Sequence, residues 1–210
     1  NMGTSAYTPP IVYDGRVNGV TSGALPKGPA PRRRGTLNEY QGDLYVLGGS
    51  GAYGGKWDGS NAEDSGLGDL WRYEIDTQTW TELTSPPETM VDHAAVVYNG
   101  YLWVYGGCRW QGENVSYARF YRYSFTGDSW ETLDDGPVAL AMTGMAVDPD
   151  NGVFYFYGGR EGADYTVTDA FLSYEVAAQT WSALGGAPPA RSEHTLTRIG
   201  RSFYVFGGAL

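Results

Sequence analysis

Cysteine, lysine and charge are all scarce in this 210-residue chain. Cys108 is the only cysteine, so no disulfide can form within the chain. Lysine occurs only at positions 27 and 56, and charged residues make up 18% of the chain, against about 25% in an average protein. Glycine, with 31 residues, and aromatic residues, at 15%, are abundant instead. This composition argues against a helical bundle and favours an all-β protein with many tight turns.

Long hydrophobic runs and a basic leader are absent as well. No apolar stretch reaches the roughly 18 residues of a membrane span, and no basic segment followed by an apolar one marks a signal peptide. The net charge of −10 would repel a nucleic acid, so we expect no nucleic-acid partner. The compartment stays open. Scarce lysine and the glycosylation sequence at Asn114-Val-Ser116 favour the extracellular space, whereas a lone cysteine fits the cytosol as well.

A glycine doublet closes four aromatic segments at nearly constant spacing. The first glycines of successive doublets are 58, 52 and 49 residues apart, and three tryptophans, each preceded by a tyrosine seven residues earlier, are 50 and 51 apart. The residues of this pattern are Gly48, Gly49, Gly106, Gly107, Gly158, Gly159, Gly207, Gly208, Tyr73, Tyr123, Tyr174, Trp80, Trp130 and Trp181. Because independent landmarks share one period, the pattern predicts a tandem repeat.

Each repeat contains four short apolar segments, a to d, separated by turn signals. Asn99-Gly100 is a typical hairpin turn between segments a and b, and proline-rich links such as Pro86-Pro87 separate the units. A four-stranded unit of about 50 residues has the size of one propeller blade. The glycine doublet, the tyrosine and the tryptophan together resemble the kelch repeat over about residues 30–210. The resemblance implies an all-β, kelch-type β-propeller of four-stranded antiparallel blades, in which these glycine and aromatic residues are structural.

The number of blades is unusual for this family. We expect one domain over residues 1–210, divided into a half-blade 8–34, blades A, B and C at 35–88, 89–137 and 138–189, and a half-blade 190–210. Ile11-Val-Tyr-Asp14 resembles strand c, so the two halves could form a fourth blade within the chain or across a homo-oligomer. Kelch propellers usually have six or seven blades. The alternative to a four-bladed ring is therefore that the chain is a segment of a larger propeller.

The loops between segments b and c differ most among the units. In a propeller these b–c loops emerge on one face, where rigid blades present binding residues. Tryptophan, tyrosine and arginine are enriched at binding hot spots. The candidates for a binding face are therefore Tyr53, Trp57, Arg109, Trp110, Arg160 and Tyr165.

Other chemical signals are weaker. His93 and His194 occupy equivalent places in two units and are interpreted as residues of the channel wall, since no third ligand stands at metal-binding spacing. Residues 148–152 resemble the start of a calcium loop, but a slightly longer hairpin accounts for them. Cys108 is expected to be a partly buried small residue. We expect no catalytic residue, metal or cofactor, and no local motif matches the copper site of the galactose-oxidase branch.

These observations favour a non-catalytic kelch-repeat scaffold that mediates protein–protein interaction through the b–c loop face. The alternative is a carbohydrate-binding propeller module that stacks sugars on Trp57, Trp110 or Tyr165. A propeller enzyme with its site at the channel mouth is the third hypothesis. The expected partner is another protein or a glycan, with no membrane span, and the chain could form a homo-oligomer if its ring does not close on itself.

Overall fold

The computed structural model describes residues 28–52, 64–110, 114–186 and 188–210, and all its regular structure is β-sheet. The all-β, kelch-type propeller architecture is confirmed by three complete four-stranded antiparallel sheets, each with its strands in chain order. No helix suited to crossing a membrane occurs in the part of the chain that is described. The strands of blades A, B and C, in the order a to d, are β1 (Thr36–Tyr40), β2 (Asp43–Leu47), β5 (Leu70–Glu74) and β6 (Thr79–Leu83); β7 (Ala94–Tyr98), β8 (Tyr101–Tyr105), β11 (Phe120–Ser124) and β12 (Ser129–Leu133); β14 (Gly144–Asp148), β15 (Val153–Tyr157), β18 (Phe171–Glu175) and β19 (Thr180–Ala183).

Turn chemistry fixes the register of the inner hairpins. Asn99 and Gly100 both have positive φ, 49° and 78°, so β7 and β8 pair directly from Tyr98↔Tyr101 to Ala94↔Tyr105. Such a two-residue turn matches the twist of the strands that it joins. At the other end of strand b the glycine doublet also has positive φ, and a Cβ on Gly106 would collide with the Leu140 carbonyl oxygen. The first residue of the doublet is therefore glycine because the backbone of the next unit approaches there.

The motif aromatic residues pack within their own blades. Tyr123 is almost fully buried, and its ring centroid lies 5.2 Å from that of the half-buried Trp130, its cross-strand partner. The equivalent pairs in blades A and C are 4.8 and 4.9 Å apart. Between blades, Trp103 of blade B contacts Phe154 of blade C. The core is thus divided into separate clusters between neighbouring sheets, in which large aromatic surfaces are removed from water.

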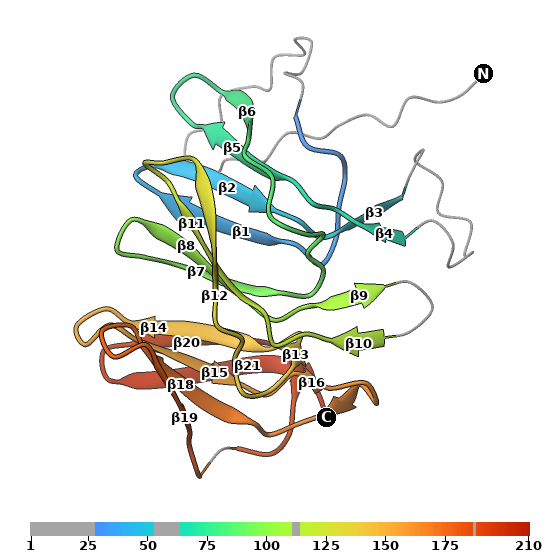
Figure 1. Ribbon diagram of the computed structural model, residues 1–210, viewed down its shortest axis with the longest axis vertical. Helices are drawn as coiled ribbons and strands as arrows, with labels where there is room; N and C mark the ends of the chain where they lie inside the picture. Colours follow the sequence, from blue (N-terminus) through green and yellow to red (C-terminus); the bar gives the residue numbers. More distant parts are fainter. Residues whose placement is uncertain (1–27, 53–63, 111–113, 187) are drawn as a thin grey trace, which may run out of the picture.

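The innermost strands lie side by side along the stack of blades. β1 lies beside β7, β7 beside β14, and β14 beside β20 (Ser192–Ile199), which pairs with β21 (Ser202–Ala209). Figure 1 shows blade A at one end of the molecule and blade C, together with the β20–β21 hairpin, at the other. The four-blade ring closed by the terminal halves stays a prediction, because residues 1–27 lie outside the described part of the chain.

The β20–β21 hairpin has one covered and one open face. Phe203 packs on Tyr155 of blade C, with ring centroids 4.5 Å apart. Phe206, on the opposite face, is 81% exposed, whereas Leu47, Tyr105 and Tyr157 at the equivalent position of the complete blades are at most 1% exposed. This position is therefore one that an adjacent blade normally covers, and the described residues include no blade that covers it here.

Short hairpins follow the glycine doublets, and sequence periodicity did not predict them. They form small sheets of their own from β3 (Ser50–Ala52) and β4 (Asp64–Gly66); β9 (Cys108–Trp110) and β10 (Asn114–Ser116); and β13 (Leu140–Ala141), β16 (Arg160–Glu161) and β17 (Thr166–Val167). Segments of two or three residues are too short for an alternating pattern to identify them. Figure 1 shows these hairpins on one side of the stack, opposite the turns that join strands a and b.

Candidate binding face and rim pocket

Four residues at one repeat position, here called the rim, surround an opening on the b–c loop side of the innermost strands. Arg34, Asp92, Met142 and Glu193 each lie one or two residues before an innermost strand or at its first residues, and all have positive φ between 54° and 61°. A non-glycine residue in this region carries a conformational cost. Its recurrence in four units shows that the surrounding structure holds this geometry.

Backbone hydrogen bonds join the rim residues from unit to unit. The Asp92 amide donates to the Arg34 carbonyl oxygen at 3.0 Å, the Met142 amide to Asp92 at 2.8 Å, and the Glu193 amide to Met142 at 3.2 Å. The rim residues are thus joined by backbone hydrogen bonds, so their side chains can differ in chemistry without loss of these bonds.

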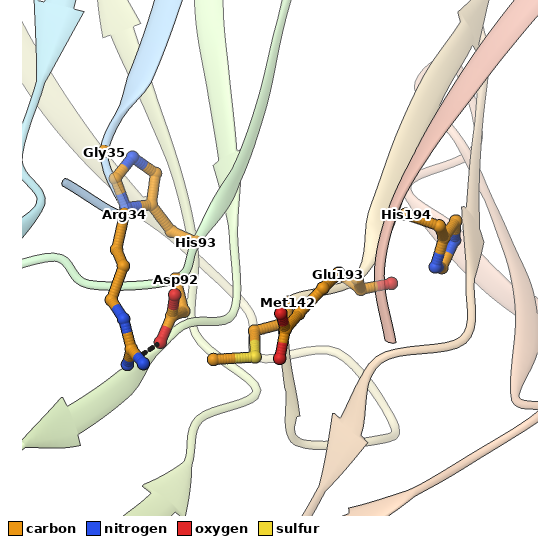
Figure 2. Close-up of a pocket in the computed structure, with 8 residues that line it drawn as sticks. Arg34, Gly35, Asp92, His93, Met142, Glu193 and His194 are labelled. Carbon is orange, nitrogen blue, oxygen red and sulfur yellow. Dashed lines mark hydrogen bonds and ion pairs between the residues drawn. The ribbon is translucent and has the colours of Figure 1, made fainter. Parts of the chain in front are cut away.

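The rim surrounds a pocket of about 290 Å³. Its lining combines each rim residue with the residue that follows it, namely Arg34, Gly35, Asp92, His93, Met142, Thr143, Glu193 and His194. Figure 2 shows Met142 and Glu193 between the Asp92 side and the His194 side of this pocket. His93 and His194, together with Gly35 and Thr143, therefore occupy equivalent places around one opening.

Both histidines are buried and neutral near pH 7. Burial lowers the pKa of His93 to about 4, and His93 Nε2 lies 3.1 Å from the Thr36 hydroxyl of blade A. Burial and the charge of Arg191 also lower the pKa of His194. Neither ring nitrogen of His194 has a hydrogen-bond partner within the described residues. Among the described residues, no group of three or more His, Cys, Asp or Glu side chains is placed to hold a metal ion.

An ionic and thiol network lies under the rim. Arg34 Nη1 donates to Asp92 Oδ2 at 3.0 Å, the Cys108 thiol lies 3.5 Å from the same oxygen, and the Tyr165 hydroxyl lies 3.7 Å from Cys108 Sγ. Burial raises the pKa of Asp92, with Glu193 adding like charge, although Arg34 acts in the opposite direction. Burial and Asp92 raise the pKa of Cys108 to about 12. The thiol is therefore protonated near pH 7 and is a poor nucleophile.

The predicted binding residues are only partly placed. Arg160 and Tyr165 come together, since Arg160 Nη1 donates to the Tyr165 carbonyl oxygen at 3.1 Å and its guanidinium lies 5.3 Å from the ring centroid. Arg109 and Trp110 lie in β9, but their side chains fall outside the described part, as do Tyr53 and Trp57 altogether. The role of these residues in binding stays a prediction.

Contacts place two further features of the sequence. Ser116, the serine of the glycosylation sequence, is buried, and its hydroxyl donates to the Arg160 carbonyl oxygen at 2.8 Å. Asp148 and Asp150 both pair with Arg198, at 2.8 and 3.0 Å, and the segment between them turns β14 into β15. That segment is the longer hairpin that the sequence analysis favoured over a calcium loop.

Sequence reasoning did not find the rim as a site. Its four residues are basic, acidic, apolar and acidic, so no shared chemistry marks them. The only signal was positional, since the two histidines were already seen to be equivalent and the rim residue stands directly before each. Backbone conformation, rather than residue type, is what makes the position repeat.

The chain is similar in sequence to several known proteins. A sequence model of the Attractin/LZTR1 beta-propeller matches residues 20–210. A leucine-zipper-like transcriptional regulator 1 homolog of Drosophila melanogaster is 27% identical over 198 residues, which is 86% of this chain and 19% of that protein. The N-acetylneuraminate epimerase of Escherichia coli is 28% identical over 166 residues, 79% of this chain and 38% of that protein.

A solved structure and the family match agree on the architecture. The structure of YjhT superposes with a TM-score of 0.68 at 18% identity, over 86% of this chain and 59% of that one. The chain spans well under half the length of the curated relatives named above. The kelch resemblance of the sequence is confirmed, because the kelch-like protein terF of Aspergillus terreus is also 28% identical over 65% of the chain. The blades, the glycine doublets and the matched range together show that the chain belongs to the Attractin/LZTR1 β-propeller family.

Proposed function

We propose that this chain is a non-catalytic scaffold that binds a protein partner on the b–c loop face, over the loop hairpins and the rim pocket. The observation that carries the proposal is the continuity of this face. β4 lies beside β9, and the Ser116 amide of β10 donates to the Gly162 carbonyl oxygen of the next loop at 3.2 Å. Successive blades thus present one connected surface, the kind of support on which binding residues collect.

The chemistry of the pocket supports binding rather than catalysis. Its thiol neighbour, Cys108, is protonated near pH 7, and its carboxylate, Asp92, is engaged by Arg34. His93, with a pKa of about 4, is a weak base. A general base or nucleophile works best when its pKa lies near the operating pH. The titratable groups here hold neighbouring blades together instead.

The test is a footprint of a bound partner. A partner recovered with the intact chain is purified, and hydrogen–deuterium exchange of the complex is compared with that of the free chain. We expect protection in β9–β10, β16–β17 and the rim. Protection confined to the opposite face, where Asp76 and Asn99 form turns, would contradict the proposal.

A matched pair of variants sharpens the same test. Asp164 and Asp76 are both exposed turn residues, but Asp164 lies in the b–c loop of blade C and Asp76 on the opposite face. We expect Asp164→Arg to weaken the affinity for the partner at least about tenfold, the size of a 1.4 kcal/mol loss. Asp76→Arg should leave the affinity unchanged. Equal effects would mean that the charge of the whole molecule, rather than the loop face, controls binding.

A sugar-binding propeller is the second candidate, favoured by the likeness to N-acetylneuraminate epimerase. The pocket charges oppose a sugar acid, because Asp92 and Glu193 outnumber Arg34, which is already paired. Calorimetric titration with N-acetylneuraminate separates the two hypotheses. Saturable binding in the micromolar to millimolar range would favour the sugar site over the protein scaffold.

A further inference from the structure

We propose that the rim pocket receives a lysine or arginine side chain of the bound protein, with its charged head at Asp92 and Glu193 and its aliphatic stem on Met142. The inference rests on the proposed scaffold function and names the chemistry that its partner presents. It is carried by the charges that line the pocket, by its apolar surface and by the imidazole of His194, which has no hydrogen-bond partner within the described residues.

The pocket holds more negative than positive charge. Arg34 is the one cationic residue in the lining of the pocket. The Arg34 guanidinium already donates to Asp92 Oδ2 at 3.0 Å. Glu193, which is exposed on the opposite side of the rim, adds a second carboxylate close enough to disfavour the charged form of Asp92. An arriving cation would offset this like-charge repulsion, whereas an anion would increase it.

The remaining lining suits a cation on a flexible aliphatic stem rather than a bare ion. Figure 2 shows the Met142 thioether beside Glu193 in the middle of the pocket. Lysine and arginine side chains pack their methylene groups on such apolar surface while their charged ends reach polar groups. The volume of about 290 Å³ accommodates one long side chain.

The buried His194 adds an acceptor for the donors of a basic side chain, whereas His93 Nε2 already lies 3.1 Å from the Thr36 hydroxyl. His93 and His194 are each more than nine-tenths buried, line the pocket and are neutral near pH 7. His194 has no hydrogen-bond partner for either ring nitrogen within the described residues. A buried polar atom without a partner is costly, and an N–H donor from a ligand would satisfy it. A neutral imidazole, unlike a charged one, accepts that bond without repelling the cation.

The experiment titrates the intact, ¹⁵N-labelled chain with Nα-acetyl-arginine-N-methylamide and its lysine counterpart and follows amide shifts by NMR. We expect saturable shifts at Asp92, Met142 and Glu193 with both cations and none with the citrulline counterpart, which is neutral but similar in shape. Absence of saturable rim shifts at millimolar concentration, or an equal response to citrulline, would overturn the proposal.

Variants separate the pocket from the general acidity of the chain. Glu193→Gln should weaken binding of the arginine compound at least about fivefold, and Asp76→Asn, which removes an exposed carboxylate on the opposite face, should not. Thermal unfolding by circular dichroism checks that both variants fold. Equal weakening by the two variants would also overturn the proposal.

The two proposals fail in different ways. A partner footprint on the loop face without an arginine response would leave the scaffold standing and remove the basic-side-chain site. A rim response to arginine with the partner bound elsewhere would do the reverse.

Discussion

Two glycines that share a left-handed backbone conformation are required for different reasons in this chain. Gly42 and Gly106 both have positive φ, 89° and 69°, but a Cβ at Gly42 would meet nothing within 4 Å, while one at Gly106 would collide with the Leu140 carbonyl oxygen. At Gly42 only the backbone conformation demands glycine. At Gly106 the approach of the next blade demands it as well.

Alanine substitutions at these two positions separate the costs. Gly42→Ala should lower the free energy of unfolding by about 1–2 kcal/mol, the cost of a left-handed alanine. Gly106→Ala should lower it by about 2–5 kcal/mol, because the overpacking adds to that cost. Urea denaturation measures both values. Equal losses would mean that the contact with Leu140 relaxes freely.

The buried neutral histidine predicts a loss of stability in mild acid. The pKa of His93 is about 4 in the folded chain and about 6.5 when unfolded, so the unfolded chain binds more protons between these values. Its contribution is therefore present above pH 6.5 and is lost as the pH falls to 4, by about 3 kcal/mol in total. His194 acts in the same direction, and the raised pKa of Asp92 acts oppositely.

Urea denaturation between pH 4 and 7.5 tests this dependence. We expect the free energy of unfolding of the wild-type chain to fall more steeply towards pH 4 than that of His93→Gln, which removes the titrating group. Parallel curves would show that His93 does not carry the effect.

At the scale of elements, the turn between strands c and d of blade B forms hydrogen bonds with the end of blade A. Asp128 Oδ1 accepts the Thr84 amide of blade A at 2.9 Å and the Tyr123 hydroxyl at 2.7 Å, while Trp130 Nε1 donates to the Thr84 carbonyl oxygen at 2.9 Å. These bonds lower the pKa of Asp128. The turn of blade B therefore holds the end of blade A.

Asparagine at position 128 tests the contribution of these hydrogen bonds to stability. Because asparagine tolerates the positive φ of 43° found there, Asp128→Asn should change little but the charge, at a cost of about 1 kcal/mol. Gln78→Asn, at the equivalent position of blade A with φ of 55°, should change stability by less than about 0.5 kcal/mol. Thermal and urea unfolding give both values, and a larger effect at position 78 would contradict the assignment.

The sequence predicted the blades far better than the candidate site. Glycine doublets, the Tyr73–Trp80 spacing and turns such as Asn99-Gly100 repeat because each blade buries the same positions, so periodicity shows them directly. The rim is different. Arg34 and Met142 share a place and a φ angle but no chemistry, and the pocket forms only when four units meet. No single unit of sequence contains that information.

At the scale of the whole molecule, the open face of β20–β21 governs how the chain behaves alone. Phe206 and Tyr204 point away from blade C, and Phe206 is 81% exposed. An unpaired strand edge with exposed aromatic residues favours association with another chain.

Light scattering coupled to size exclusion tests this association. We expect a mass above 22.8 kDa that rises with concentration, and a return to 22.8 kDa in Phe206→Asp. Gln41→Asp, in the exposed turn of blade A, is the control and should leave the mass unchanged. A wild-type mass of 22.8 kDa at every concentration would instead support closure by the chain's own terminal halves.

The backbone hydrogen bonds of the rim also bear on how binding preference can diverge. Since the bonds that join Asp92, Met142 and Glu193 use only amide and carbonyl groups, substitution at Met142 or Glu193 changes what the opening attracts without removing a bond of the frame. The side-chain atoms of these residues set the chemistry of the opening, and their backbone atoms hold the frame together. Propellers built this way can acquire new partners through a few rim exchanges, with the blades inherited intact.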